Sequence, residues 1–149
     1  QLRSRLSNIA GSTLGCAQCA GLATCATRGL TTIWQWLNQL NAAGLGGHSD
    51  WRVPTIGQDG GAAQLETIAD TTAPGCRSGP PCVPAVFDTG CSPGCSVTGC
   101  SCTAPDYYWS ATTYAADPHG AWGFYFFAGF VDFGNKFDCC YTFGVRAVR

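Results

Sequence analysis

The sequence has few charged residues, no methionine and no long hydrophobic segment. Charged residues make up 11% of the chain, whereas soluble proteins typically contain about 25%. The formal net charge is −1, so the chain lacks the basic surface that binding to nucleic acid or anionic lipid requires. No apolar run reaches the roughly 20 residues that cross a bilayer, and we expect no membrane insertion. Because methionine is absent, we expect that Gln1 is not the translational start.

Cysteine and glycine, by contrast, are abundant. The 149 residues include 20 glycines and 11 cysteines. Reducing compartments seldom contain proteins with so many cysteines, whereas exported domains use them as disulfides. We therefore expect an extracellular or cell-surface protein. All eleven cysteines are disulfide candidates, and an odd number leaves at least one unpaired within the chain: Cys16, Cys19, Cys25, Cys76, Cys82, Cys91, Cys95, Cys100, Cys102, Cys139 and Cys140.

Metal binding is the alternative explanation of these cysteines. Cys16 and Cys19, and likewise Cys91 and Cys95, have the short spacing of zinc ligands. Neither pair is followed by a second pair at the usual interval or by two histidines. We therefore predict no metal site and no cofactor.

The hydrophobic pattern predicts an α+β domain at 27–149 after a cysteine-containing N-terminal segment at 1–26. A helix capped by Thr31 or Thr32 is expected from apolar residues at helical spacing, and glycines follow it: Ile33, Trp34, Leu37, Leu40 and Leu45. A second, short helix is expected at about 62–69. Residues 71–105 hold six of the eleven cysteines and six of the eight prolines, which predicts a long disulfide-stapled loop. Within that loop, Val83–Phe87 is apolar enough to enter the core.

The C-terminal third predicts short antiparallel strands. A first strand is expected at 107–110, and a hairpin at 122–127 and 130–133 with its turn at Ala128-Gly129. A last strand is expected at 141–148. It would place Phe143, Val145 and Ala147 on one face and Arg146 on the other.

Several sequence blocks then resemble the C-terminal domain of the bacterial collagen-like adhesin family. The blocks are Leu45–Thr55 (LGGHSDWRVPT), Tyr108–Tyr114 (YWSATTY), Ala121-Trp122 and Val145–Arg149 (VRAVR). They occur in order, with 71–105 as an insertion. The resemblance implies a C-type-lectin-like fold, in which we expect structural roles for Trp51, Trp109 and Trp122. Arg52 and Arg146 are flanked by apolar residues and are expected to be structural cations that pair with carboxylates or backbone carbonyls.

The same resemblance implies an extracellular ligand-binding or adhesion module. The acidic and amide motifs with which C-type lectins bind calcium are absent, and Glu66 is the only glutamate; we therefore expect binding without calcium. The scaffold is also similar to variable proteins of diversity-generating retroelements, which diversify one C-terminal stretch. This similarity suggests a variable or formerly variable binding face at 123–142.

Aromatic residues concentrate in that stretch, since seven of the eight phenylalanines lie between positions 124 and 143. Strand alternation would point Trp122, Phe124 and Phe126 inward and Gly123, Tyr125 and Phe127 outward. Phe127, Phe130, Phe133 and Phe137 would then form an exposed aromatic patch, or, alternatively, be core residues covered by the stapled loop. The candidate ligand-binding residues are Tyr125, Phe127, Phe130, Asp132, Phe133, Asn135, Phe137, Asp138 and Tyr141.

Two other functions stay open. The domain could be a structural subunit of an extracellular homo-oligomer or filament, with the aromatic face between chains. The adjacent Cys139 and Cys140 also suggest a third hypothesis, an oxidase like the formylglycine-generating enzymes, which use paired active-site cysteines. Those enzymes, however, are longer and space their cysteines differently. His48 and His119 lie in loops, and we predict no catalytic residue. The expected partner is an unidentified extracellular protein or glycan.

Overall fold

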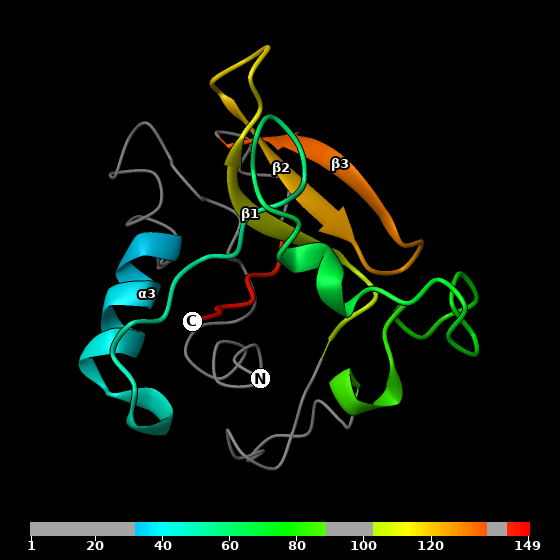
Figure 1. Cartoon of the computed structure of the whole chain (residues 1–149), viewed down its shortest axis with the longest axis horizontal. Coiled ribbons are helices and arrows are strands. Elements are labelled where there is room, and N and C mark those ends of the chain that lie inside the picture. Colours follow the sequence, from blue (N-terminus) through cyan, green and yellow to red (C-terminus); the bar gives the residue numbers. More distant parts are fainter. Residues whose placement is uncertain (1–31, 89–102, 137–142) are drawn as a thin grey trace, which may run out of the picture.

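One α-helix and a three-stranded antiparallel sheet make up the main regular structure of the described residues (Figure 1). The computed structural model describes residues 32–88, 103–136 and 143–149. The α-helix and the strands are α3 (Ile33–Ala42), β1 (Tyr107–Thr113), β2 (Gly120–Tyr125) and β3 (Phe130–Asn135); the 3-10 helices are η1 (Leu45–Gly47), η2 (Leu65–Ile68) and η3 (Ala85–Phe87). The predicted α+β class is confirmed. None of the helices in these ranges combines the length and apolar character needed to cross a membrane.

Helix α3 begins where the sequence predicts. The Thr32 hydroxyl accepts a hydrogen bond from the Gln35 backbone N–H (3.1 Å), and the Gln35 side-chain oxygen accepts one from the Thr32 N–H (3.0 Å). This capping box satisfies two backbone donors at the start of the helix. The helix ends before Gly44, whose φ of 58° is left-handed. Trp34, expected on the apolar face, is 48% exposed, and Trp36 takes the buried position instead.

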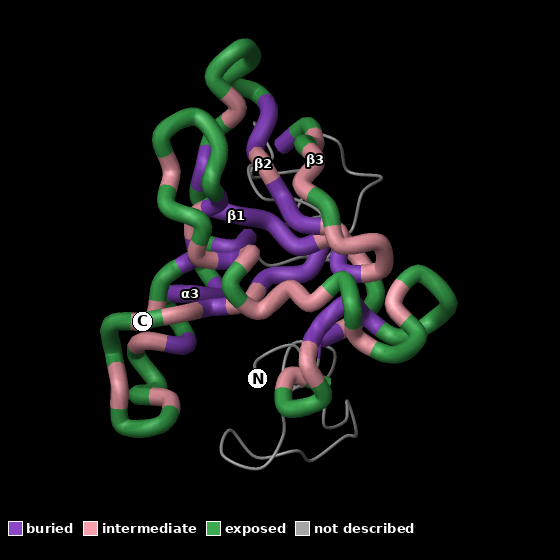
Figure 2. Tube along the Cα trace, turned by 45° about the vertical axis from the view of Figure 1, so that its right-hand side comes forward, coloured by how far each residue is buried: buried purple, intermediate pink, exposed green. Residues whose placement is uncertain are grey.

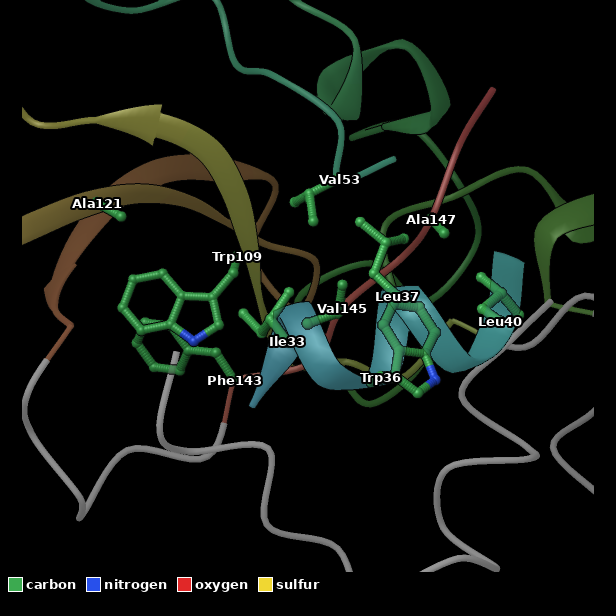
Figure 3. Close-up of a cluster of buried hydrophobic side chains, with 10 residues drawn as sticks. All are labelled: Ile33, Trp36, Leu37, Leu40, Val53, Trp109, Ala121, Phe143, Val145 and Ala147. Atoms are coloured by element: carbon green, nitrogen blue, oxygen red, sulfur yellow. The ribbon is translucent and has the colours of Figure 1, made fainter. Parts of the chain in front are cut away.

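Hydrophobic clusters cover both faces of the sheet. The cluster between α3 and the sheet also includes the C-terminal segment (Figure 3): Ile33, Trp36, Leu37, Leu40, Val53, Trp109, Ala121, Phe143, Val145 and Ala147. The other cluster consists of Ile56, Leu65, Val83, Tyr108, Phe124 and Phe126. Because alternate residues of a strand point to opposite faces, the neighbours Tyr108 and Trp109 of β1 enter different clusters. Strands β1 and β2 are accordingly buried over most of their length (Figure 2).

The second helix expected at 62–69 is only the four-residue 3-10 helix η2. Tertiary hydrogen bonds engage its backbone. The Leu65 N–H donates to the Thr55 carbonyl, and the Thr55 hydroxyl donates to the Ala62 carbonyl. These bonds to a distant segment replace the i to i−4 bonds of an α-helix, which explains why the apolar spacing did not produce one.

The last strand expected at 141–148 is an extended segment with two isolated bridges in its described part, 143–149. Gly144 bridges Tyr108 in parallel, and Val148 bridges Arg52 in antiparallel orientation. Because the two bridges go to different segments, no continuous ladder forms. The predicted alternation is nevertheless present, since Phe143, Val145 and Ala147 are buried and Arg146 is only partly buried.

One disulfide, between Cys76 and Cys82, lies in the described part of the predicted stapled loop. Val83 beside it is 3% exposed and belongs to the core, whereas Val86 is 64% exposed. The expected entry of 83–87 into the core is therefore confirmed at its start and wrong at Val86. The other nine cysteines and the N-terminal segment at 1–26 lie outside the described residues.

Candidate ligand-binding surface

Strands β2 and β3 form a hairpin as predicted, but β2 ends at Tyr125, so Phe126 and Phe127 belong to the turn and not to the strand. The register of the hairpin separates the exposed aromatic rings. Tyr125 pairs with Phe130, and Trp122 pairs with Phe133. Phe130 and Phe133 are three residues apart in an extended strand, so they point to opposite faces of the sheet. Phe130 is 45% exposed and Phe133 is 50% exposed. The single aromatic patch expected from the sequence is therefore divided into two surfaces.

The first surface, which we call the Phe130 surface, consists of Tyr107, Tyr125, Phe130 and Asp132. The Tyr107 and Tyr125 rings stack with centroids 4.1 Å apart, and Phe130 lies edge-on to Tyr125 at 5.4 Å. The Tyr107 hydroxyl donates a hydrogen bond to Asp132 Oδ2 at 3.4 Å. Burial and, next, the Asp132 charge raise the pKa of Tyr107. The phenol therefore remains a neutral donor at physiological pH.

The second surface, which we call the Phe133 surface, consists of Asp59, Tyr114, Trp122 and Phe133. Tyr114 and Phe133 stack with centroids 4.4 Å apart, and Trp122 lies edge-on to both. The Trp122 indole Nε1 donates to Asp59 Oδ2 at 2.7 Å, and the Ala115 backbone N–H donates to the same oxygen at 2.7 Å. These two bonds, the one from Trp122 foremost, lower the pKa of Asp59. Three rings and a carboxylate thus form one preorganised platform.

The disulfide loop supports the turn between β2 and β3. The Cys82 N–H donates to the Phe126 carbonyl at 2.6 Å, and the Arg77 N–H donates to the Phe127 carbonyl at 3.0 Å. Arg77 Nε also donates to the Ala128 carbonyl at 3.2 Å. In its described part, the loop binds the backbone of the turn and leaves Phe130 and Phe133 exposed. The described part of this loop therefore does not cover those two rings.

The remaining candidate residues divide between core, surface and segments that are not described. Phe124 and Phe126 are buried as predicted, at 3% and 0% exposure, whereas Trp122, expected inward, is half-buried. Tyr125, Phe127 and Asp132 are half-buried, and Asn135 is exposed. Phe137, Asp138, Cys139, Cys140 and Tyr141 lie outside the described residues.

Trp51 and Arg52 connect the helical region to neighbouring segments. The side chain of Asn41 makes two hydrogen bonds with the Trp51 backbone, and the Trp51 indole donates to the Leu45 carbonyl. The Arg52 guanidinium donates to the side-chain oxygen of Gln64, which replaces the carboxylate or backbone carbonyl expected from sequence. The same Gln64 oxygen also accepts a hydrogen bond from the Thr55 backbone N–H at 3.2 Å.

Arg146 is partly buried, and Trp109 lies in the interior. The Arg146 guanidinium donates to the Thr103 hydroxyl at 2.7 Å and lies 5.4 Å from the centre of the Phe87 ring. Burial lowers its pKa. Trp109 is 1% exposed, and its indole Nε1 has no hydrogen-bond partner in the described part of the chain. A buried donor without a partner is uncommon and costly.

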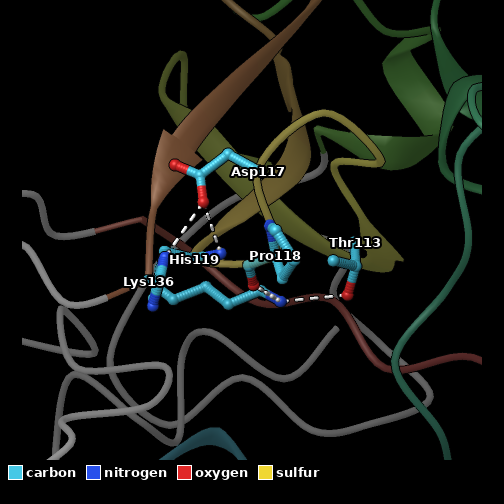
Figure 4. Close-up of polar contacts among 5 residues, drawn as sticks. All are labelled: Thr113, Asp117, Pro118, His119 and Lys136. Carbon is cyan, nitrogen blue, oxygen red and sulfur yellow. Dashed lines mark hydrogen bonds and ion pairs between the residues drawn. The ribbon is translucent and has the colours of Figure 1, made fainter.

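Three polar or aromatic residues of interest were not found by sequence reasoning: Asp59, Tyr114 and Lys136. Lys136 follows β3 and is 9% exposed; its ammonium donates to the Thr113 hydroxyl at 2.9 Å and the Pro118 carbonyl at 3.0 Å (Figure 4). The available signal was that Lys136 is the only lysine in the chain.

His119, in the loop before β2, contacts Asp117 at 3.0 Å, and both are exposed. Among residues 32–88, 103–136 and 143–149, no group of three or more His, Cys, Asp or Glu side chains could hold a metal ion.

Comparison with known proteins identifies a family but no individual relative. The family model described as the Lcl C-terminal domain matches residues 12–149. The match includes all described residues and the loop at 71–105. No curated protein and no solved structure matches the chain.

Proposed function

The chain belongs to the Lcl C-terminal domain family, and from this premise we propose that it is an extracellular ligand-binding or adhesion module with a C-type-lectin-like fold. Its recognition surface is the β2–β3 hairpin, and binding needs no calcium. The observation that carries this proposal is the exposure of Phe130 and Phe133, at 45% and 50%, on a hairpin whose other rings hold them in place. Contiguous exposed apolar patches, such as Phe133 together with its stacked neighbours, are typical of interaction sites.

The Phe133 surface is the stronger candidate of the two. Phe133 stacks on Tyr114, and a hydrogen bond to Asp59 fixes the neighbouring Trp122, so little conformational entropy is lost when a ligand binds. Asn135 lies on the same face of β3 and adds an exposed amide. A protein or a glycan that presents an apolar surface beside hydrogen-bond donors fits this combination.

A binding comparison of four proteins tests the proposal. Wild type, Phe133→Ser, Phe130→Ser and the control Val86→Ser are applied to glycan arrays and to immobilised extracellular proteins, each with and without a calcium chelator. Val86 is a matched control because it is exposed and apolar but belongs to η3. Covering the exposed half of one phenylalanine contributes about 1 kcal/mol, or roughly fivefold in Kd. Phe133→Ser should therefore weaken binding at least fivefold while Val86→Ser does not. Equal binding by all four proteins, or binding abolished by the chelator, would contradict the proposal.

The second candidate is a subunit of an extracellular homo-oligomer. The specific observation in its favour is that exposed rings occupy both faces of β3, which allows contacts in two directions. Light scattering over a range of protein concentrations distinguishes the two functions. An oligomer that Phe133→Ser or Phe130→Ser dissociates supports the subunit, whereas a monomer that retains ligand binding supports the module.

A further inference from the structure

A small cavity lies between the start of α3 and the sheet. Its volume is about 110 Å³, and its lining comes from α3, the segment before β1, the sheet and the residue after β3: Ile33, Trp34, Val53, Trp109, Ser110, Ala111, Thr113, Ala121 and Lys136. A cavity of about 150 Å³ holds one benzene molecule, so this cavity holds a group of a few heavy atoms. Trp34 is 48% exposed, so one wall continues to the molecular surface.

Two of the residues that line this cavity, Lys136 and Trp109, have an N–H donor without a partner among the described residues, whereas the Ser110 and Thr113 hydroxyls already have partners. The Lys136 ammonium has three N–H donors, and two of them bind Thr113 and Pro118. In the described part of the chain no carboxylate lies within ion-pair distance of Lys136. The buried Trp109 indole Nε1 likewise has no hydrogen-bond partner in the described part of the chain. A buried ammonium usually has an anionic partner, because isolated burial of a charge is costly.

The N-terminal turn of α3 adds a third source of positive potential. The Thr32 side chain caps the Gln35 N–H, and the Thr32 carbonyl accepts from Trp36. Ile33 and Trp34 line the cavity, and their backbone N–H groups have no hydrogen-bond partner among the described residues. Free N–H groups and the helix dipole together favour an anion at a helix N-terminus.

The rest of the lining is apolar. Ile33, Val53 and Ala121 belong to the buried cluster around Trp109, where Figure 3 shows Trp109 beside Ile33. Burial lowers the pKa of Lys136, and the charge of Asp117 only partly opposes this effect. Asp117 itself is exposed and hydrogen-bonded to His119.

We propose that this cavity binds the carboxylate of a small organic acid, or a terminal carboxylate of a larger ligand. The carboxylate accepts hydrogen bonds from the Lys136 ammonium and the first turn of α3. The short apolar part of the ligand lies against Ile33 and Val53. This site is independent of the exposed hairpin rings and does not rest on the function proposed for them.

The unique lysine makes a direct test possible. Incorporation of lysine labelled with ¹³C at Cε gives a single side-chain NMR signal, which reports on Lys136. The protein is titrated with propionate and, in parallel, with propionamide, which has nearly the same shape but no charge, at constant ionic strength. We expect a saturable shift of the Lys136 signal with propionate only. The absence of a saturable shift, or an equal response to both compounds, would overturn the proposal.

Two variants complete the test. Lys136→Met keeps an unbranched side chain and removes the charge, so propionate affinity, followed through the tryptophan indole N–H signals, should fall about tenfold or more. Arg149→Gln removes one positive charge at the exposed C-terminal residue and should leave the affinity unchanged. Equal weakening in both variants would indicate a non-specific charge effect and overturn the site. If Lys136→Met does not fold, the comparison of propionate with propionamide on the wild type decides.

Discussion

Replacement of Gly134 by alanine should destabilise the domain, although alanine normally stabilises a strand relative to glycine. Gly134 pairs with Ala121 across the hairpin. A Cβ atom at position 134 would lie 2.7 Å from Phe143 Cε2 and 3.0 Å from Trp109 Cη2. Both rings are buried, at 8% and 1% exposure, and they contact each other with centroids 4.4 Å apart. Neither ring can therefore move aside without disturbing the cluster between α3 and the sheet.

The expected size of the effect follows from two opposing contributions. An additional methyl group in a well-packed core typically costs about 1–3 kcal/mol. The lower entropy of alanine in the unfolded chain offsets about 0.5–1 kcal/mol of that cost. The net cost from these ranges is about 0–2.5 kcal/mol. Because the Cβ would meet two buried rings at 2.7 and 3.0 Å, we expect Gly134→Ala to lower the free energy of unfolding by about 1–2 kcal/mol, which corresponds to roughly 2–8 °C in Tm for a domain of this size.

Denaturant unfolding followed by tryptophan fluorescence measures this change, and two further variants give a graded comparison. Gly123→Ala would place its Cβ 2.7 Å from the Tyr108 carbonyl oxygen, which belongs to the β1 backbone, so its cost should be at least as large. Gly120→Ala would place its Cβ 3.2 Å from Tyr114 Cβ and 3.3 Å from the Asp117 carbonyl oxygen, which are longer contacts, so its cost should be smaller than that of the other two variants. A Gly134→Ala protein as stable as the wild type, or more stable, would refute the reasoning and the close contact of Trp109 and Phe143 with β3.

Three other predictions concern the helix cap, the disulfide and the Phe133 surface. Thr32→Ala removes the N-cap of α3 and should lower the free energy of unfolding by about 1 kcal/mol, as measured by thermal unfolding; no change would contradict the capping box. Joint replacement of Cys76 and Cys82 by serine opens a loop of about seven residues and should lower the free energy of unfolding by about 2 kcal/mol by the chain-entropy relation. Denaturant unfolding of the variant and of the oxidised wild type measures this difference. Equal stability would contradict a structural role of the disulfide. The Trp122 indole N–H signal should change as pH falls through a midpoint below the ordinary aspartate pKa of 3.8, because the pKa of Asp59 is lowered. The stabilisation from the Asp59–Trp122 hydrogen bond is present above the unfolded-state pKa of Asp59 and is lost as pH falls through its folded-state pKa. An unchanged midpoint in Asp59→Asn would contradict the assignment to Asp59.

The sequence predicts the elements that depend on local chemistry. Thr32 defines the start of α3, and the apolar spacing predicts Ile33, Leu37 and Leu40 on its buried face, although not Trp36. The turn at Ala128-Gly129 defines the hairpin. The alternation of Phe143, Val145 and Ala147 likewise follows from strand geometry. These features depend on residues within a few positions of one another, where propensity and periodicity are informative.

The features that the sequence did not predict depend on contacts between distant segments. The division of Phe130 and Phe133 between two faces follows from the register of β2 and β3. The short helix at 65–68 follows from hydrogen bonds to Thr55. No sequence motif marks Lys136, because its place in the cavity lining depends on its position near a helix that begins about a hundred residues earlier. Register, tertiary hydrogen bonds and burial of single charges are outside what a local pattern can specify.

The sheet places the two proposed binding features on opposite faces. Lys136 and the cavity lie on the face that packs against α3, together with Trp109 and Ala121. Phe133 points to the opposite face, beside Trp122 and Tyr114. Residues on opposite faces that share no partner normally contribute independently to stability and binding. A ligand on the Phe133 surface and a carboxylate in the cavity therefore need not compete, and coupling between them would have to pass through the strands themselves.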